Sequence, residues 1–456
     1  MNEPARIKAT MEHLLAQGVE YCFATYIDVH GVPKAKTVPI ASFAKMAMGS
    51  ELFTVGAMEG MGLVGPQQDE CAAVPDLDSL VILPWAPRFA WFASDLYFHG
   101  QPYANCARVI LKKQLALAAA QGLTFNLGVE AEFYVFRRTA EGILPLSTLP
   151  FRGPTPAYDV HQTMQAMPFL DPMVKNLNAL GWGVYSFDQE GGHGQVELDF
   201  AYADALITCD RLVFLRFMAK QIAASLGAVA SFMPKPFAGD FRSGAHFNMS
   251  MAKDGKNLFD GSGALAAKYG IGFPDAAYHF IAGLLEHAPA LTAITCPTHN
   301  SYKGLIAQGD MPDMSWAPVL RCYGRNNRSA MLRLPMNRPC VENRSPDIAA
   351  NFHLSAALSL AAGMDGMARQ ADPGAPWNEN LYELVEGRAA PAAGAMPPRL
   401  PRTLIEAVDA FAADPLVTES LGAEFRDIYI RQKTREWDQA FYRVSDEERE
   451  RQLDYV

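Results

Sequence analysis

The chain has 456 residues, of which half are hydrophobic, 11% are aromatic and 19% are charged. With 39 Lys and Arg against 49 Asp and Glu, its formal net charge is −10, which excludes a strongly basic nucleic-acid-binding protein. The composition supplies ample apolar surface for a large core and argues against extended disorder.

The seven cysteines are odd in number, scattered, and without a Cys-x-x-Cys pair, so we expect reduced thiols. The N-terminal segment lacks the apolar core of a secretory signal, and no apolar run approaches the roughly 18 to 20 residues of a membrane span. These features predict a cytoplasmic protein that does not act at a membrane.

The first hundred residues are predicted to be rich in strands. A helix over residues 4–17 precedes a hairpin formed by 21–27 and 34–39, and short strands follow at 79–83 and 89–96. Gly100 to Pro102 then interrupts the pattern. We therefore place a domain boundary near residue 104, with a small domain over 1–104 and a larger one over 105–456.

The larger part is predicted to be α+β. Its pattern indicates long helices at 107–120, 203–226, 275–288 and 349–369, with strands between them. Proline and glycine crowd residues 371–401, which is typical of surface connections, and charged helices close the chain.

Two carboxylates share one face of a predicted strand over residues 128–136. Glu130 and Glu132 alternate with apolar residues, so they lie about 7 Å apart on the same side. A solvent-facing strand with two ordinary acids is one interpretation. The other is a divalent metal site, because acids so close together in apolar surroundings resist ionisation without a cation.

A second acidic strand follows a glycine-rich turn. Glu197 and Asp199 alternate with apolar residues, and the glycines at 191, 192 and 194 allow Glu190 to fold back toward them. The repeated pattern favours the metal interpretation. His193 lies in the same turn, but a lone loop histidine is more often solvated than a ligand.

A third strand carries polar residues on one face. His246, Asn248 and Ser250 alternate with Phe247 and Met249. Considered alone, His246 is more simply a satisfied core histidine. Together with the acids, one imidazole among many carboxylates suits Mg²⁺ or Mn²⁺ better than zinc.

Three arginines stand in otherwise apolar or neutral sequence beyond residue 323. Arg328, Arg333 and Arg344 require anionic partners there, and Glu342 would share a strand face with Arg344. Salt bridges to the acids above would satisfy any one of them. Three arginines beside a metal cluster favour phosphate chemistry. The chain has no P-loop motif, so a P-loop fold is not the source of nucleotide binding. The charges still indicate a polyphosphate held by divalent cations and arginines, a site that can stabilise transfer of a γ-phosphoryl group to a substrate carboxylate.

In this context the chain resembles the glutamine synthetase family along nearly its whole length. The resemblance rests on segments that occur in the family's order with comparable spacing: Glu130 to Phe133, Glu190 with Glu197, Met233 to Pro236, Ser243 to His246, Asn300 to Lys303, and Asn327 to Ser329. It implies a small N-terminal β-grasp domain, a larger catalytic domain, and a homododecamer of stacked rings with active sites between subunits.

The resemblance also implies roles for individual residues. One metal would be held by Glu132, Glu190 and Glu197, and the other by Glu130, His246 and Glu342. Asn248, Ser250, Arg328 and Arg333 would contact ATP, with Arg328 and Glu342 acting in catalysis. The acid substrate would be bound by Arg344, Arg242, Gly244 and Trp316.

Departures from the family pattern concern the substrates. Residues 53–60 lack the Asp found in ammonia-using members, and Gly56, Ala57 and Met58 suit a larger, less polar amine. The segment 304–321 lacks the usual Glu, for which Asp310 or Asp313 would substitute. Gly304 stands where Arg is common, and Arg242 would restore that positive charge.

These features are similar to the type III branch, whose members include ligases that join glutamate to methylamine. The resemblance therefore implies an ATP-dependent ligase that forms a γ-glutamyl phosphate from glutamate and transfers the acyl group to an amine. Methylamine is the favoured amine, with ammonia or another alkylamine as the alternative. A catalytically silent scaffold and a metal-dependent hydrolase are the other hypotheses, which product analysis would separate.

Overall fold

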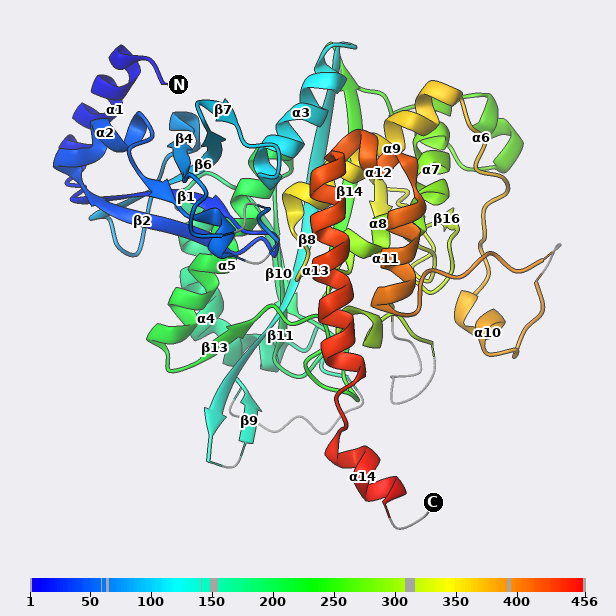
Figure 1. Ribbon diagram of the computed structural model, residues 1–456. Coiled ribbons are helices and arrows are strands. Elements are labelled where there is room, and N and C mark those ends of the chain that lie inside the picture. Colours follow the sequence, from blue (N-terminus) through cyan, green and yellow to red (C-terminus); the bar gives the residue numbers. More distant parts are fainter. Residues whose placement is uncertain are drawn as a thin grey trace.

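The computed structural model describes residues 2–58, 60–62, 65–140, 142–147, 155–307, 316–391 and 395–453 (Figure 1). Helices and strands are mixed throughout, which confirms the predicted α+β class. The strands form two sheets, one in the N-terminal part and one through the larger part of the chain. Within the described ranges, no helix is long and apolar enough to cross a membrane.

The N-terminal sheet has the main strand order β2-β1-β6-β4-β3. Its strands are β1 (Tyr21–Ile27), β2 (Pro33–Pro39), β3 (Leu52–Phe53), β4 (Cys71–Pro75), β5 (Val81–Ile82), β6 (Phe89–Phe98) and β7 (Gln101–Pro102). The predicted hairpin is confirmed, since β1 and β2 pair antiparallel. The Asp28 carboxylate accepts from the backbone N–H groups of His30 and Val32 and stabilises the turn between them.

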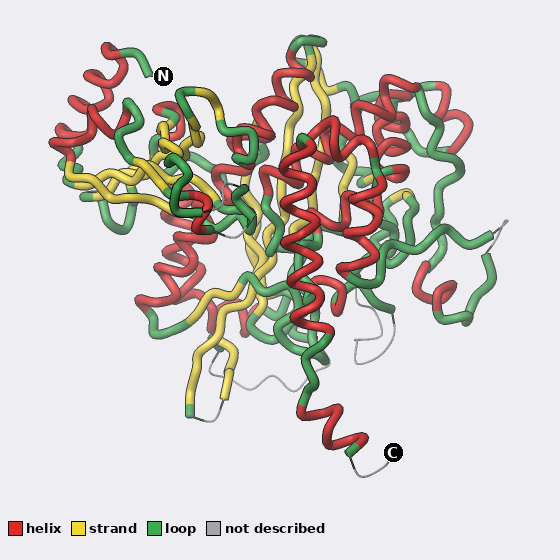
Figure 2. The backbone as a smooth tube through the Cα atoms, in the orientation of Figure 1, coloured by secondary structure: helices red, strands yellow, loops and turns green. Residues whose placement is uncertain are grey.

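The second sheet runs through the middle of the molecule, with helical segments to either side (Figure 2). Its main order is β10-β11-β8-β14-β18-β17-β16. The strands are β8 (Leu123–Thr139), β9 (Gly142–Pro145), β10 (Val184–Gln189), β11 (Gln195–Phe200), β12 (Ala203–Asp204), β13 (Val229–Ser231), β14 (Ala245–Lys253), β15 (Lys256–Asn257), β16 (Tyr323–Arg325), β17 (Leu332–Leu334) and β18 (Val341–Asn343).

The predicted long helices are confirmed as α3, α5, α7 and α9. The helices are α1 (Pro4–Ala16), α2 (Phe43–Ala47), α3 (Ala107–Ala119), α4 (Val160–Ala179), α5 (Ala205–Ser225), α6 (Ala264–Tyr269), α7 (Asp275–Glu286), α8 (Ala288–Thr295), α9 (Phe352–Arg369), α10 (Leu381–Val385), α11 (Leu404–Ala413), α12 (Pro415–Leu421), α13 (Ala423–Phe441) and α14 (Asp446–Gln452). The helix α4, which contains Pro168 and Pro172, was not predicted. Proline usually breaks a helix, but buried side chains such as Phe169 and Met173 hold this one in place.

The two sheets are joined by packing and by a buried ion-pair network. Trp91 of β6 packs against Phe214 and Phe217 of α5, with ring centroids 5.6 and 5.2 Å apart. Arg108 of α3 contacts Asp95 of β6 at 2.7 Å and Asp210 of α5 at 3.0 Å. The N-terminal sheet is thereby fixed against the larger part of the chain.

Candidate active site

Strand β8 lies at the centre of the candidate site because both of its long neighbours bring polar residues into register with its acids. Glu132 pairs with Glu197 of β11, and Glu130 pairs with His246 of β14. On the other side of β14, Asn248 pairs with Glu342 of β18. Antiparallel pairing thus collects polar side chains from four strands on one face.

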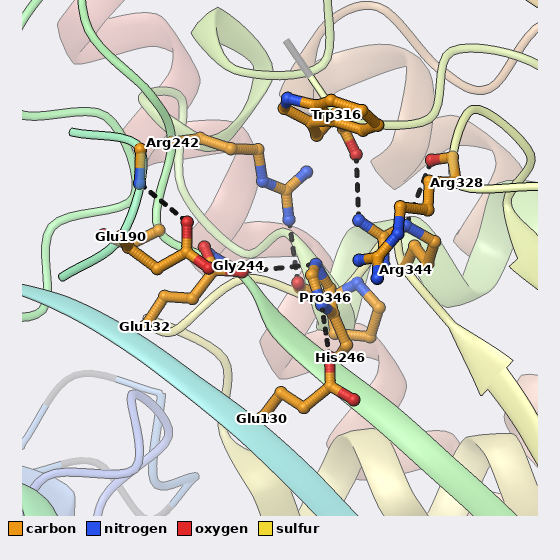
Figure 3. A network of polar contacts seen from close by, with 12 residues as sticks. Glu130, Glu132, Glu190, Arg242, Gly244, His246, Trp316, Arg328, Arg344 and Pro346 are labelled. Atoms are coloured by element: carbon orange, nitrogen blue, oxygen red, sulfur yellow. Dashed lines mark hydrogen bonds and ion pairs between the residues drawn. The ribbon is translucent and has the colours of Figure 1, made fainter. Parts of the chain in front are cut away.

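Of these residues, Glu130, Glu132, Glu197 and His246 line one cavity of about 910 Å³, whereas Asn248 and Glu342 do not. Its polar lining includes Glu130, Glu132, Asp188, Glu190, Gln195, Glu197, Asp199, Arg242, His246, Arg328, Arg333, Asn337, Arg338 and Arg344. Several of them form the network of polar contacts in Figure 3. The cavity is large enough to hold a nucleotide-sized or amino-acid-sized ligand.

One group of potential metal ligands consists of Glu132, Glu190 and Glu197. One carboxylate oxygen from each lies within 4.8 Å of the others. Burial, with Glu190 as the next cause, raises the pKa of Glu132 to about 8. Burial also raises the pKa of Glu190 and lifts the pKa of Glu197 well above its ordinary value. The three carboxyl groups offer only oxygen ligands, and no positive charge nearby is sufficient to keep them ionised. The group therefore fits a hard divalent cation.

The second group consists of Glu130, His246 and Glu342, again with ligand atoms within 4.8 Å. His246 Nδ1 lies 3.1 Å from Glu130 Oε2. Although burial opposes ionisation, His246 and Arg338 hold the pKa of Glu130 well below its usual range. Arg344 likewise outweighs burial and lowers the pKa of Glu342. Ionised oxygen ligands with one imidazole suit Mg²⁺ or Mn²⁺.

Comparison with known proteins identifies the chain's relatives. The family model for the glutamine synthetase catalytic domain matches residues 104–452. The chain belongs to the glutamine synthetase family. The glutamate–methylamine ligase of Methyloversatilis universalis is 39% identical over 94% of this chain and 95% of its own length.

Other members of the glutamine synthetase family are also similar over nearly their full length. The glutamine synthetase of Rhizobium leguminosarum bv. phaseoli is 34% identical, covering 96% of this chain and 97% of the relative. A solved structure of a GmaS/ADP complex has a TM-score of 0.89 and 36% identity, covering 98% of this chain and 99% of that one. The predicted family is thus confirmed.

The family's expected arginines gather around Glu342, which has no exposed surface. Arg333 Nη1 donates to Glu342 Oε2 at 2.7 Å, and Arg344 Nη1 donates to Glu342 Oε1 at 2.5 Å. Arg344 also donates to the backbone carbonyls of Arg328 and Trp316. Arg328 lines the same cavity. These guanidinium groups present positive charge beside the two carboxylate groups, as phosphate binding requires.

Arg242 and Gly304 fit against each other. The Arg242 guanidinium donates to the carbonyls of Ser345 and Pro346 at 2.8 and 2.7 Å. A Cβ on Gly304 would lie 2.8 Å from the Cβ of Arg242, so the missing side chain makes room for the arginine. Arg242 lines the candidate cavity, and its guanidinium is turned toward backbone carbonyls.

Gly244 is fixed by the metal-ligand candidates around it. Its backbone N–H donates to Glu132 Oε2 at 2.7 Å, and a Cβ there would lie 2.7 Å from His246 Nε2. Position 244 therefore requires glycine, since any side chain would displace the imidazole.

Some predicted residues lie away from the cavity. Asn248 donates to Glu130 Oε1 at 3.1 Å without lining the cavity, and Ser250 is buried farther along β14. His193 is held by Asp240 rather than by the acidic groups. The Gly56–Met58 segment does not line the cavity either; there, Met58 Sδ accepts from the Tyr26 hydroxyl at 3.5 Å. Asp310 and Asp313 lie outside the described residues.

Two cavity residues, Arg338 and Tyr158, were not predicted from the sequence. Arg338 donates to Glu130 Oε1 at 2.6 Å. It stands next to a proline and outside any strand pattern, so the sequence did not indicate that it belongs to the site. Tyr158 lines the cavity close to Glu190. It precedes a helix that was not predicted, so nothing in the sequence singled it out.

Proposed function

We propose that this chain is an ATP-dependent ligase that joins the γ-carboxylate of glutamate to methylamine. A glutamate oxygen attacks the γ-phosphorus of ATP and ADP leaves. The amine nitrogen then attacks the acyl carbon, phosphate leaves, and the nitrogen gives up one proton to yield the N-methyl amide. The observation that carries the proposal is the pair of three-residue ligand groups, of which all members but the fully buried Glu342 line one arginine-rich cavity.

We assign each residue a role from its place in the site. Glu132, Glu190 and Glu197 would hold one Mg²⁺ or Mn²⁺, and Glu130, His246 and Glu342 would hold the other. When bound, such cations neutralise charge on the transferred phosphoryl group and its leaving group. Arg328 and Arg333 would bind the transferred phosphate. Asn248 and Ser250 would contact ATP indirectly, since neither lines the cavity.

The acid substrate would be bound near the cavity rim. Arg344 is buried and fixed by Glu342, which pre-orients its guanidinium for a carboxylate. Arg242, Gly244 and Trp316 line the same cavity and would shape the rest of the acid-substrate site. Arg242 would act by holding the backbone after Arg344, since it donates to the carbonyls of Ser345 and Pro346.

Methylamine is favoured because the 39% identical Methyloversatilis relative is a glutamate–methylamine ligase. Ammonia is the second candidate, since several glutamine synthetases are 31 to 34% identical. We further propose a dodecamer of stacked rings with sites between subunits, in which a neighbouring chain would bring Gly56–Met58 to the amine. The domain boundary near residue 104 and the cytoplasmic location stay predictions.

The test is product analysis. The protein is incubated with ATP, Mg²⁺, glutamate and methylamine, and products are identified by mass. The N-methyl amide of glutamate, formed with one ADP and one phosphate per amide, supports the proposal. Phosphate without an amide would identify a hydrolase, and no turnover would favour a scaffold.

A further inference from the structure

A second cavity, of about 600 Å³, lies beside α7, on the side of the molecule away from the N-terminal sheet (Figure 1). It shares no lining residue with the first cavity. Residues of α7 form it together with the segments 321–323, 371–379 and 395–398. None of these residues has a role in the proposed function. The volume is sufficient for a ligand of the size of an amino acid.

Hydrogen bonds hold the walls of this second cavity together. The Arg321 N–H donates to the Pro398 carbonyl, and the Trp377 N–H donates to the Tyr323 carbonyl, both at 2.8 Å. The Tyr323 hydroxyl also donates to the Gly374 carbonyl at 2.6 Å. Since the three segments are tied to one another, the cavity is formed before a ligand enters, which lowers the ordering cost of binding.

One wall of the second cavity is bonded to the segment that carries Arg328. The Asn327 side-chain amide donates to the carbonyls of Trp377 and Glu379 at 2.9 and 3.0 Å. Trp377 and Glu379 both line the second cavity, whereas Arg328 lines the first. A ligand in the second cavity would therefore contact a wall that is fixed by the residue next to Arg328.

Two acids that line the second cavity are neutralised by basic neighbours. Glu286 Oε2 lies 2.5 Å from Arg369 Nη2. Asp372 Oδ2 lies 2.7 Å from Lys268 Nζ. Because these ion pairs already satisfy both carboxylates, a ligand gains little from either of them.

Arg321 and Glu379 line the same cavity without neutralising each other. Within the described ranges, neither side chain forms an ion pair, and the Arg321 guanidinium donates no hydrogen bond. The Glu379 carboxylate accepts from the Asn378 N–H at 3.1 Å. Both side chains belong to partly buried residues. The described part of the cavity thus offers one unpaired positive charge and one unpaired negative charge.

The rest of the lining is mainly apolar. It includes Leu285, Pro376, Trp377 and Met396. The Trp377 side chain packs against a buried cluster that contains Leu320, so its position is fixed. Such a surface favours a ligand with a hydrocarbon side chain.

We propose that the second cavity binds a small zwitterionic amino acid with an apolar side chain. The carboxylate of the ligand would pair with Arg321 and its ammonium group with Glu379, while its side chain lies against Trp377. A simple anion would leave Glu379 unpaired, and a simple cation would leave Arg321 unpaired. A ligand that carries both charges satisfies both residues. This inference goes beyond the proposed function and does not depend on it.

The test uses L-leucine as the probe and the full-length protein without ATP. Saturation-transfer NMR on the leucine methyl signals measures the dissociation constant. Isoamylamine lacks the carboxylate of leucine, and 4-methylvalerate lacks its ammonium group. The variants Arg321→Gln and Glu379→Gln each remove one charge from the cavity. Arg325→Gln is the matched control, since Arg325 is exposed on β16 and lines neither cavity.

We expect L-leucine to bind saturably, and isoamylamine and 4-methylvalerate to bind at least about tenfold more weakly. Arg321→Gln and Glu379→Gln should each weaken leucine binding by at least about tenfold, and Arg325→Gln by less than about twofold. Melting curves establish that the variants are folded. The proposal is overturned if leucine does not bind, if either single-charge probe binds equally well, or if both cavity variants bind leucine as the wild type does.

Hydrogen exchange in the wild-type protein locates the site without any variant. Leucine should slow the exchange of backbone amides in 321–323 and 376–381, because it contacts these walls. Slowed exchange confined to 128–136 and 242–246 would place leucine in the first cavity and overturn the proposal. Neither measurement uses turnover, so both outcomes are independent of whether the chain forms an amide.

Discussion

Glu132 and Glu197 stand directly opposite each other on neighbouring antiparallel strands, β8 and β11. Two carboxylates in this arrangement repel each other, and burial deepens the cost. The strand pairing therefore holds the two acids together only at the expense of stability. A bound divalent cation would relieve that cost, which links the fold of the sheet to the proposed chemistry.

Replacing Glu132 tests the first ligand group. Glu132→Gln keeps the side-chain size but removes the charge, so we expect phosphoryl transfer to fall by more than about 100-fold. Assembly and metal-free thermal stability should be unchanged or improved, because a repulsive carboxylate is lost. Phosphate release and a melting curve check this, and near-wild-type turnover would remove Glu132 from the metal site.

The raised pKa of Glu132, about 8, predicts a pH dependence of the metal-free protein. Between the ordinary carboxyl pKa of 4.5 and this value, the folded chain binds more protons than the unfolded chain. Stability contributed by this group is therefore complete at low pH and is lost as pH rises toward 8. The melting temperature measured in EDTA should fall between pH 6 and pH 8.5, and it should fall less in Glu132→Gln. The increase in melting temperature on adding Mg²⁺ should be largest at high pH.

Arg344 is predicted to bind the acid substrate. Arg344→Ala should raise KM for glutamate by at least about tenfold. It also leaves Glu342 buried without one partner, which costs about 3–5 kcal/mol of stability. Arg344→Lys keeps a charge and serves as the control for folding. An unchanged KM for glutamate in a folded variant would contradict the assignment.

Gly304 and Arg242 are predicted to be energetically coupled. Gly304→Ala places a methyl group against the arginine stem and should cost about 1–3 kcal/mol, with a higher KM for glutamate. In the double variant with Arg242→Gly, which removes the Cβ that the new methyl group would meet, the alanine at 304 should add little further. Denaturant unfolding and steady-state kinetics test this double-mutant cycle, and strictly additive effects would contradict the close packing.

Much of this site was predictable because strand periodicity places acids on one face. The alternation around Glu130 and Glu132 located β8, and motif order assigned the partners on β11, β14 and β18. Periodicity cannot show where an arginine outside a strand points, so the contact from Arg338 to Glu130 was missed. The helix α4 was also missed. Its two prolines predict a break from the local sequence, whereas the burial of its side chains, which stabilises the helix, depends on the tertiary structure.

The amine segment shows another limit of sequence reasoning. Gly56 to Met58 was assigned by comparison with ammonia-using enzymes, yet within one chain it lies apart from the cavity. Sequence alone does not specify whether a residue serves its own chain or a neighbour. Tyr158 illustrates the reverse case, because its left-handed backbone is visible only in three dimensions.

Amine competition tests the central claim most directly. The protein receives ATP, Mg²⁺, glutamate, and methylamine and ammonia at equal free-base concentrations, and the two amides are quantified by mass. We predict that the N-methyl amide predominates by at least about tenfold, as expected when binding contacts to the methyl group contribute to selectivity. A predominance of glutamine would contradict the claim and make the chain an ammonia-using glutamine synthetase.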